Sequence, residues 1–147
     1  MELRQSAYAS KLLEKAGMGG CNGCAIPMEP RLKLSKKSSS PLVDATLYRS
    51  LIRSLRYLLH TRPDLTFSVG YLSRFMEEPR QEHMAALKHL LRYVAATMDY
   101  GLQYTQGEGE LLLLGYSDMA GDIDDRKSTS GVFFVLDGNP MTWLSQK

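Results

Sequence analysis

Two cysteines at a C-x-x-C spacing, Cys21 and Cys24, are the first candidates for metal or redox chemistry in this chain. A structural zinc site needs four ligands, and the three histidines, His60, His83 and His89, are not spaced as a partner pair. A redox C-x-x-C normally begins a helix, whereas the glycines around this motif place it in a loop. We therefore expect two free thiols in a flexible turn, no metal site and no cofactor.

Positive charge is concentrated in one part of the chain. Residues 31–62 contain eight lysines and arginines and one acid, Asp44, although the net charge of the whole chain is only +2. Within this segment Arg49, Arg53 and Arg56 recur at a spacing that places them on one face of a helix. Such a face can bind the phosphates of nucleic acid or lipid, and it can equally be a solvated surface. These three arginines are the candidate binding residues.

Negative charge is concentrated nearer the other end. Residues 108–125 contain six acids and no base. The acids that follow the apolar run ELLLLGYSD are adjacent in sequence to two basic residues, and such a mixture of charges is typical of a solvated loop. The residues assigned to this loop are Asp122, Asp124, Asp125, Arg126 and Lys127.

The overall composition is that of a folded protein. The chain has 147 residues, of which 44% are apolar and 23% are charged, so it is long enough for one domain or two small ones. No apolar run approaches the ~18 residues that a membrane-spanning helix needs. A secretory signal is not visible either, because Glu2, Arg4 and Lys11 interrupt the apolar residues of the N-terminus.

The first half of the chain is predicted to be helical. Apolar residues at helical spacing predict helices over 5–16, over 45–60, between Pro63 and Pro79, and over 80–96. The last three are consecutive, joined by short turns, and are expected to pack together. Residues expected on buried faces are Ala9, Leu12, Leu13, Ala16, Leu47, Leu51, Leu55, Leu58, Leu65, Val69, Leu72, Met76, Met84, Leu87, Leu91 and Val94. The aperiodic, proline-containing stretch 17–44 is interpreted as a linker or an extended arm.

The second half is predicted to form strands. Short runs rich in aromatic and branched residues cover 101–105, 110–118, 131–136 and 141–144, and they are separated by Gly and Asp clusters. Asp137-Gly138-Asn139 is a strong hairpin signal between the last two runs. The expected fold class is therefore α+β, with an N-terminal helical bundle followed by a small antiparallel sheet.

The expected organisation has three parts. Residues 1–44 form a short helix and a flexible basic arm. Residues 45–98 form the segment of three helices. Residues 99–147 form the sheet.

Several ordered blocks of the sequence resemble one known family. YRSLIRSLRYLLHTRPD (48–64) resembles the end of the reverse transcriptase region in Ty1/copia-type retrotransposon polyproteins, where the typical pattern is YRSLVGSLxYLxxTRPD. FSVGYLSRFMEEP (67–79), HMAALKHLLRYVAATMDYGLQY (83–104) and GYSD…GDIDDRKSTSG (115–131) are similar to the blocks that follow in that family. Because AYASKLLEKAGM also matches, the resemblance covers nearly the whole chain.

The resemblance implies that residues 45–98 are the tail of a polymerase and residues 99–147 the start of an RNase H domain. RNase H chemistry uses several carboxylates to hold two metal ions, and by resemblance Asp118 is the first of them. The others are expected beyond Lys147, and the polymerase's Tyr-x-Asp-Asp motif upstream. The family pattern YSDxDWAGD is also two residues shorter here, because MAGD follows Asp118 directly. We therefore expect no enzymatic activity and no active catalytic residue, Asp118 included.

One departure from the family pattern creates a second motif. Arginine replaces the usual glycine at position 53, so that the chain reads Arg53-Ser54-Leu55-Arg56. R-x-L-R resembles the motif of the RxLR effectors, secreted proteins of plant-pathogenic oomycetes that enter host cells and suppress defence. Leu55 lies in the predicted apolar stripe, whereas the two arginines can stay exposed with Arg49 and bind phosphates. The alternative is an ordinary amphipathic helix with solvated arginines.

Three functions from different classes follow. The main prediction is a secreted RxLR-type effector, built on a non-catalytic Pol-like fragment, which suppresses cell death in the cytoplasm or nucleus of a host plant cell. Its expected partners are an unidentified host protein and phosphoinositide head groups. The alternative is a retrotransposon Pol fragment that binds nucleic acid and is inactive on its own. A third possibility is an inert relic whose residues 132–135 are exposed at strand edges and prone to aggregate.

Overall fold

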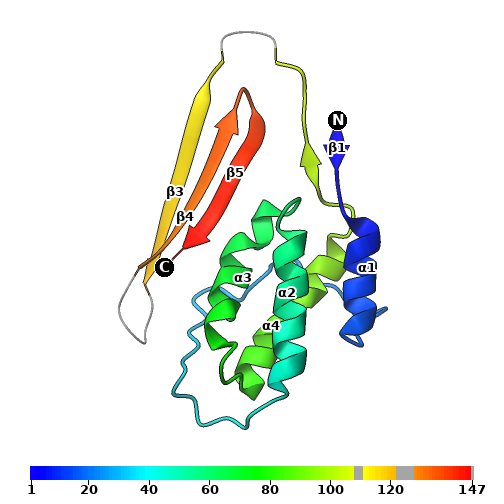
Figure 1. Cartoon of the computed structure of the whole chain (residues 1–147), viewed down its shortest axis with the longest axis vertical. Coiled ribbons are helices and arrows are strands. Elements are labelled where there is room, and N and C mark those ends of the chain that lie inside the picture. Colours follow the sequence, from blue (N-terminus) through cyan, green and yellow to red (C-terminus); the bar gives the residue numbers. More distant parts are fainter. Residues whose placement is uncertain (108–110, 122–127, 147) are drawn as a thin grey trace.

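The computed structural model describes residues 1–107, 111–121 and 128–146 of the chain. In these residues a bundle of helices is followed by an antiparallel sheet that lies beside it (Figure 1). The helices are α1 (Ser6–Lys15), α2 (Ala45–Leu58), α3 (Thr66–Leu72) and α4 (Gln81–Ala96), with 3-10 turns at Pro63–Leu65 and Ser73–Phe75. The predicted α+β class is confirmed.

Local capping interactions determine where α1 ends and α2 begins. Asp44 precedes α2, and its carboxylate accepts hydrogen bonds from the backbone amides of Thr46 (2.9 Å) and Leu47 (3.3 Å). After α1 the chain turns at Gly17, whose φ of 67° is in the left-handed region that favours glycine. Because such signals are local in sequence, both boundaries lie close to the predicted ones.

The face that α2 buries differs from the predicted stripe. Leu47 is 39% exposed, whereas Tyr48 and Ile52 are fully buried. The Tyr48 hydroxyl donates a hydrogen bond of 2.8 Å to the backbone oxygen of Leu72, so its polar end is satisfied inside the core. The same burial raises the pKa of Tyr48 well above its usual value. Leu51, Leu55 and Leu58 are buried as predicted.

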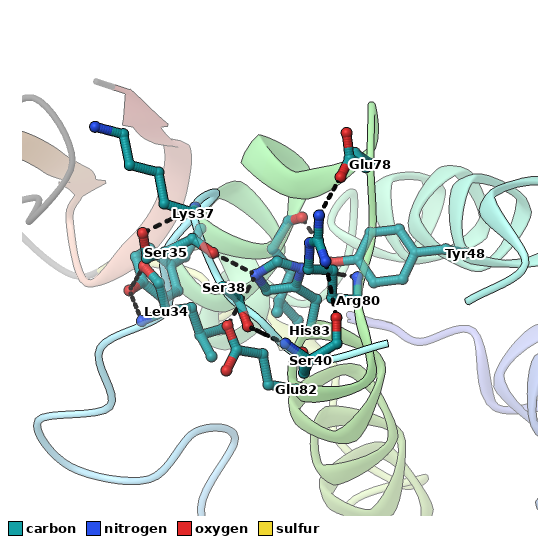
Figure 2. A network of polar contacts seen from close by, with 12 residues as sticks. Leu34, Ser35, Lys37, Ser38, Ser40, Tyr48, Glu78, Arg80, Glu82 and His83 are labelled. Atoms are coloured by element: carbon teal, nitrogen blue, oxygen red, sulfur yellow. Dashed lines mark hydrogen bonds and ion pairs between the residues drawn. The ribbon is translucent and has the colours of Figure 1, made fainter. Parts of the chain in front are cut away.

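The segment 17–44 has no helix, as expected of an arm, but it is bound closely to the bundle. Leu34 is buried in the core, and the backbone amide of Leu34 donates a hydrogen bond of 2.9 Å to the Tyr71 hydroxyl. Figure 2 shows that His83, at the start of α4, accepts from the amide of Arg80 through Nδ1 and contacts the backbone oxygen of Ser35 (3.1 Å) through Nε2. Arg80 also donates to the backbone oxygen of Ser40 (2.9 Å). Nε2 of the buried His83 and the guanidinium of Arg80 therefore hold the arm in place, while Nδ1 of His83 caps the start of α4.

The strands form two separate sheets. The three-stranded sheet has the order β3 (Leu113–Gly121), β4 (Ser128–Leu136), β5 (Asn139–Gln146), and the other sheet pairs β1 (Glu2–Leu3) with β2 (Leu102–Gln103). The sequence did not predict β1 or its pairing. The N-terminal ammonium group of Met1 donates to the backbone oxygen of Tyr104 (2.7 Å) and fixes this pairing between distant segments.

The hairpin between β4 and β5 is confirmed. Leu136 pairs with Asn139 across a turn in which both Asp137 (φ 49°) and Gly138 (φ 75°) have positive φ, as a type I′ turn requires. β3 begins and ends later than predicted, because β4 starts at Ser128 and pairs with it as far as Gly121. Asp118 therefore lies opposite Gly131 inside the strand rather than at its end.

The sheet contacts the bundle mainly through β5. The indole nitrogen of Trp143 donates to the backbone oxygen of Leu59 (2.9 Å), next to the end of α2. The sheet also exposes apolar side chains, with Leu113 at 60%, Leu144 at 52% and Phe134 at 37%. No helix in the described ranges is long and apolar enough to cross a membrane.

A buried arginine joins the turn after α2 to the end of α4. Arg62 is 2% exposed and makes a bidentate ion pair with Asp64, at 2.9 and 2.7 Å. Its guanidinium also donates to the backbone oxygen (2.9 Å) and the hydroxyl (2.7 Å) of Thr97. The Tyr93 hydroxyl donates to Asp64 (3.0 Å), and burial together with this carboxylate raises the pKa of Tyr93 to about 12. The charge is thus fully paired.

Removing one partner of this pair is expected to destabilise the bundle. Asp64→Ala leaves the buried Arg62 charge without its counter-ion, which costs about 3–5 kcal/mol. Urea unfolding followed by circular dichroism measures the loss. Glu2→Ala is the matched control, because Glu2 pairs with Arg4 (3.5 Å) at the surface, where ion pairs contribute little. Equal losses in the two variants would contradict this role.

Candidate nucleic-acid interface

Cationic and aromatic side chains of α1 and α2 gather on one surface of the bundle. This surface, the α1–α2 face, consists of Tyr8, Lys11 and Lys15 from α1 and of Arg53, Arg56, Tyr57 and His60 from α2 and the turn after it. Two contacts join the helices there. The Lys15 ammonium group donates to the Ser54 hydroxyl (3.4 Å), and the rings of Tyr8 and Tyr57 lie 4.9 Å apart.

Helical spacing brings these side chains to the same side of each helix. Tyr8, Lys11 and Lys15 are three and four residues apart, so Lys11 lies between the two side chains that contact α2. On α2, Arg53 and Tyr57 are four residues apart and therefore lie on one side of that helix. The α1–α2 face therefore carries cations on both sides of its aromatic rings.

The three candidate arginines divide into two kinds. Arg53 and Arg56 are exposed and make no hydrogen bond or ion pair with the part of the chain that the structure describes. Arg49 instead donates from Nε to the backbone oxygen of Met76 (2.7 Å) and from Nη2 to that of Glu77 (3.1 Å). Arg49 thus holds the end of the turn after α3, and two of the three arginines remain available to a ligand.

The R-x-L-R motif is divided between the surface and the core. Leu55 is fully buried, whereas Arg53 and Arg56 are exposed and Ser54 is half-buried. The hydroxyl of Ser54 donates to the backbone oxygen of Ser50 (3.1 Å) within the helix. A partner can therefore reach both arginines of the folded protein but not the leucine.

The aromatic rings of the α1–α2 face support one another. Tyr57 is 53% exposed, with Tyr8 inclined against it at 57° and His60 edge-on at 5.6 Å. Neighbours on two sides restrict the Tyr57 ring while leaving much of its surface open. Open aromatic rings beside cations are typical of surfaces that bind nucleic acid, because phosphates meet the cations and bases stack on the rings.

Of the acidic candidates, Asp118 lies away from the α1–α2 face. The backbone of Asp118 is in β3, on the sheet. The predicted solvated loop, with Asp122, Asp124, Asp125, Arg126 and Lys127, lies outside the described residues.

Several residues of the α1–α2 face were not predicted from the sequence. Tyr8, Lys11 and Lys15 lie on the first helix, where the apolar spacing predicts only the buried side. Tyr57 follows Arg53 by four residues, and an aromatic residue at this spacing from an arginine lies on the same face of a helix. This spacing is the sequence signal that identifies Tyr57 as part of the face.

Comparison with known proteins shows strong similarity to transposon sequences. The chain is 42% identical over 149 aligned residues to the retrovirus-related Pol polyprotein from transposon RE1 of Arabidopsis thaliana, an alignment that covers all of this chain and 10% of that protein. It is 38% identical to the corresponding polyprotein from transposon TNT 1-94 of Nicotiana tabacum, over 98% of this chain and 11% of that protein. The chain thus spans about a tenth of the length of these relatives.

The chain is also similar to a shorter protein that is named as a secreted effector. The chain is 46% identical over 103 residues to secreted RxLR effector protein 161 of Plasmopara viticola, covering 68% of this chain and 72% of that protein. No protein-family model and no solved structure matches the chain.

The division of the R-x-L-R motif predicts unequal effects of substitution. Leu55→Ala creates a cavity in the core and is expected to cost about 2–5 kcal/mol. Arg53→Ala and Arg56→Ala should leave the free energy of unfolding nearly unchanged, because both side chains are solvated. Urea unfolding compares them, with Leu47→Ala as the control for a leucine at the surface of the same helix. Equal losses for Leu55→Ala and Leu47→Ala would contradict the burial of the motif.

Proposed function

Because this chain belongs to the family of copia-type retrotransposon Pol polyproteins, we propose that it is a segment of such a polyprotein that binds nucleic acid and has no catalytic activity of its own. Its ligand would be the nucleic acid on which the rest of a Pol polyprotein acts. The α1–α2 face would bind that ligand through its phosphates.

The observation that carries this proposal is the set of cations on the α1–α2 face, none of which makes an ion pair within the described residues, although Glu14 precedes Lys15 on α1. Arg53 and Arg56 are exposed, and Lys11 and Lys15 extend the positive surface across α1. α2 itself contains no acid, and the nearest one in sequence, Asp44, caps its N-terminus. When such side chains bind nucleic acid, they displace the counter-ions condensed on its phosphates, and the release of these counter-ions favours binding.

The absence of catalysis is supported by the sequence rather than by geometry. Asp118 alone matches a family carboxylate, and the motif around it is two residues shorter than the family pattern. Two divalent cations need several carboxylates to hold them. The proposed role is therefore to hold and position nucleic acid.

Salt dependence tests the binding role. Fluorescence anisotropy with a short labelled DNA duplex, repeated over a series of salt concentrations, is expected to show log K falling linearly with log salt. In the double variant Arg53→Ala/Arg56→Ala the slope should become shallower by about 2, since each lost phosphate contact removes about one unit.

The control removes the same charge from another part of the surface. Lys33 and Lys88 line grooves beside the arm and α4, and Lys33→Ala/Lys88→Ala should keep the wild-type slope. Equal slopes for the wild type and the arginine variant would exclude the α1–α2 face as the binding surface.

A second candidate function is that of a secreted effector. It is supported by the similarity to the Plasmopara viticola protein over most of its length and by the exposure of Arg53 and Arg56. In this role the chain acts inside a plant cell on a host protein, without chemistry at Asp118.

A leaf assay distinguishes this second function. When the chain is expressed in leaf cells together with an inducer of cell death, an effector is expected to reduce the lesion area, and Asp118→Ala should retain the reduction. A nucleic-acid-binding fragment without effector function should leave the lesion area equal to that with an inert protein. Immunoblotting confirms equal expression in all samples.

A further inference from the structure

The turn that contains the C-x-x-C motif is fixed against α4. The amide of Cys24 donates to the backbone oxygen of Arg92 (3.3 Å), and the Arg92 side chain donates back to the oxygen of Asn22 (2.8 Å). Gly23 approaches α4 so closely that an added Cβ would lie 2.6 Å from Cβ of Ala96. The fold thereby brings Cys24 beside His89, 65 residues away in sequence.

Three potential metal ligands meet at this point. The distance from Cys24 Sγ to His89 Nε2 is 3.6 Å, and the backbone oxygen of Ile26 lies 3.4 Å from Sγ and 3.0 Å from Nε2. Tetrahedral zinc binds sulfur at about 2.3 Å and nitrogen or oxygen at about 2.0–2.2 Å, which places neighbouring ligands roughly 3.4–3.6 Å apart. The two distances from Sγ fall in this range, and the 3.0 Å between Nε2 and the Ile26 oxygen has to lengthen by about 0.4 Å for the three atoms to form one face of a zinc tetrahedron.

The second nitrogen of His89 faces a carboxylate. Nδ1 lies 3.9 Å from Oε1 of Glu29, on the side of the ring away from the sulfur. Histidines that bind zinc commonly donate their other N–H to a carboxylate, which fixes the tautomer and the orientation of the ring. In the metal-free chain Nε2 donates to the backbone oxygen of Ile26 (3.0 Å), so metal binding moves the proton to Nδ1, where Glu29 is the nearest acceptor.

Cys21 can supply the fourth ligand. It precedes Cys24 by three residues, the spacing at which two thiolates bind one zinc ion, and both thiols are half-buried and free of disulfides. The amide of Cys21 donates to the backbone oxygen of Met18 (3.2 Å), so its sulfur has to reach the site by rotation of the side chain. Within the described ranges no three side chains of His, Cys, Asp or Glu already converge on one point, so Cys21 has to turn inward.

We propose that Cys21, Cys24, His89 and the backbone oxygen of Ile26 bind a zinc ion. Each thiol loses its proton to solvent as its sulfur bonds to the metal, so one Zn²⁺ releases two protons. The ion would link the turn of the arm to the middle of α4. This site is independent of the α1–α2 face and of the proposed binding of nucleic acid.

Cobalt(II) is the probe, because it occupies zinc sites and absorbs visible light. Titration of the whole, reduced chain with Co²⁺ should produce the intense d–d bands of tetrahedral coordination and a thiolate-to-Co²⁺ charge-transfer band, and added Zn²⁺ should abolish both. Zn²⁺ alone should raise the thermal midpoint of the chain. Weak bands typical of octahedral Co²⁺, or no bands at all, would overturn the proposal.

Variants identify the ligands. Cys24→Ser should abolish the charge-transfer band, Cys21→Ser should roughly halve it, and His89→Gln should abolish the tetrahedral d–d bands. Glu29→Gln should weaken Co²⁺ binding about 10–100-fold without changing the bands, as for a residue that positions a ligand. His60→Gln is the matched control, because His60 is exposed at the end of α2 and should bind cobalt like the wild type.

Circular dichroism of each metal-free variant separates loss of binding from loss of folding. Variants that fold like the wild type but keep its cobalt absorption, in Cys24→Ser or His89→Gln, would overturn the assignment. So would equal loss of binding in His60→Gln.

Discussion

The buried guanidinium of Arg62 is the constraint on which the helical bundle depends. A charge that is 2% exposed has to be paired, and Arg62 meets this requirement with Asp64 two residues later and with Thr97 at the end of α4. The turn between α2 and α3 and the last turn of α4 must therefore meet at one point. The end of α2 is fixed by this contact, and the backbone oxygen of Leu59 beside it accepts the Trp143 hydrogen bond through which the sheet docks.

The parts of the fold that could be predicted depend on neighbouring residues. Gly17 ends α1, Asp44 begins α2 and Asp137-Gly138 forms the hairpin, each within a few residues of the signal. Pairings between distant segments could not be predicted in this way. β1 meets β2 across a hundred residues, and Tyr48 replaces Leu47 in the core because its hydroxyl finds the backbone of Leu72.

The candidate sites show the same limit. Periodicity placed Arg49, Arg53 and Arg56 on one helix, but it does not distinguish an arginine that binds backbone oxygens from one that stays solvated. Arg49 differs because the turn after α3 presents the oxygens of Met76 and Glu77 to it. Likewise, spacing along the chain argued against a metal ligand near the C-x-x-C motif, whereas the packing of the arm on α4 brings His89 to Cys24.

The burial of Leu55 decides how the R-x-L-R sequence can act while the protein is folded. A receptor that reads the leucine as part of a linear peptide has to expose a side chain that is fully buried in the core. Exposure requires α2 to leave the bundle, and the remaining helices would lose the core residues with which they pack. Binding to phosphates needs only Arg53 and Arg56, which are already exposed. In the folded chain these arginines therefore act as part of a charged surface, together with Lys11 and Lys15 on α1, rather than as a peptide motif.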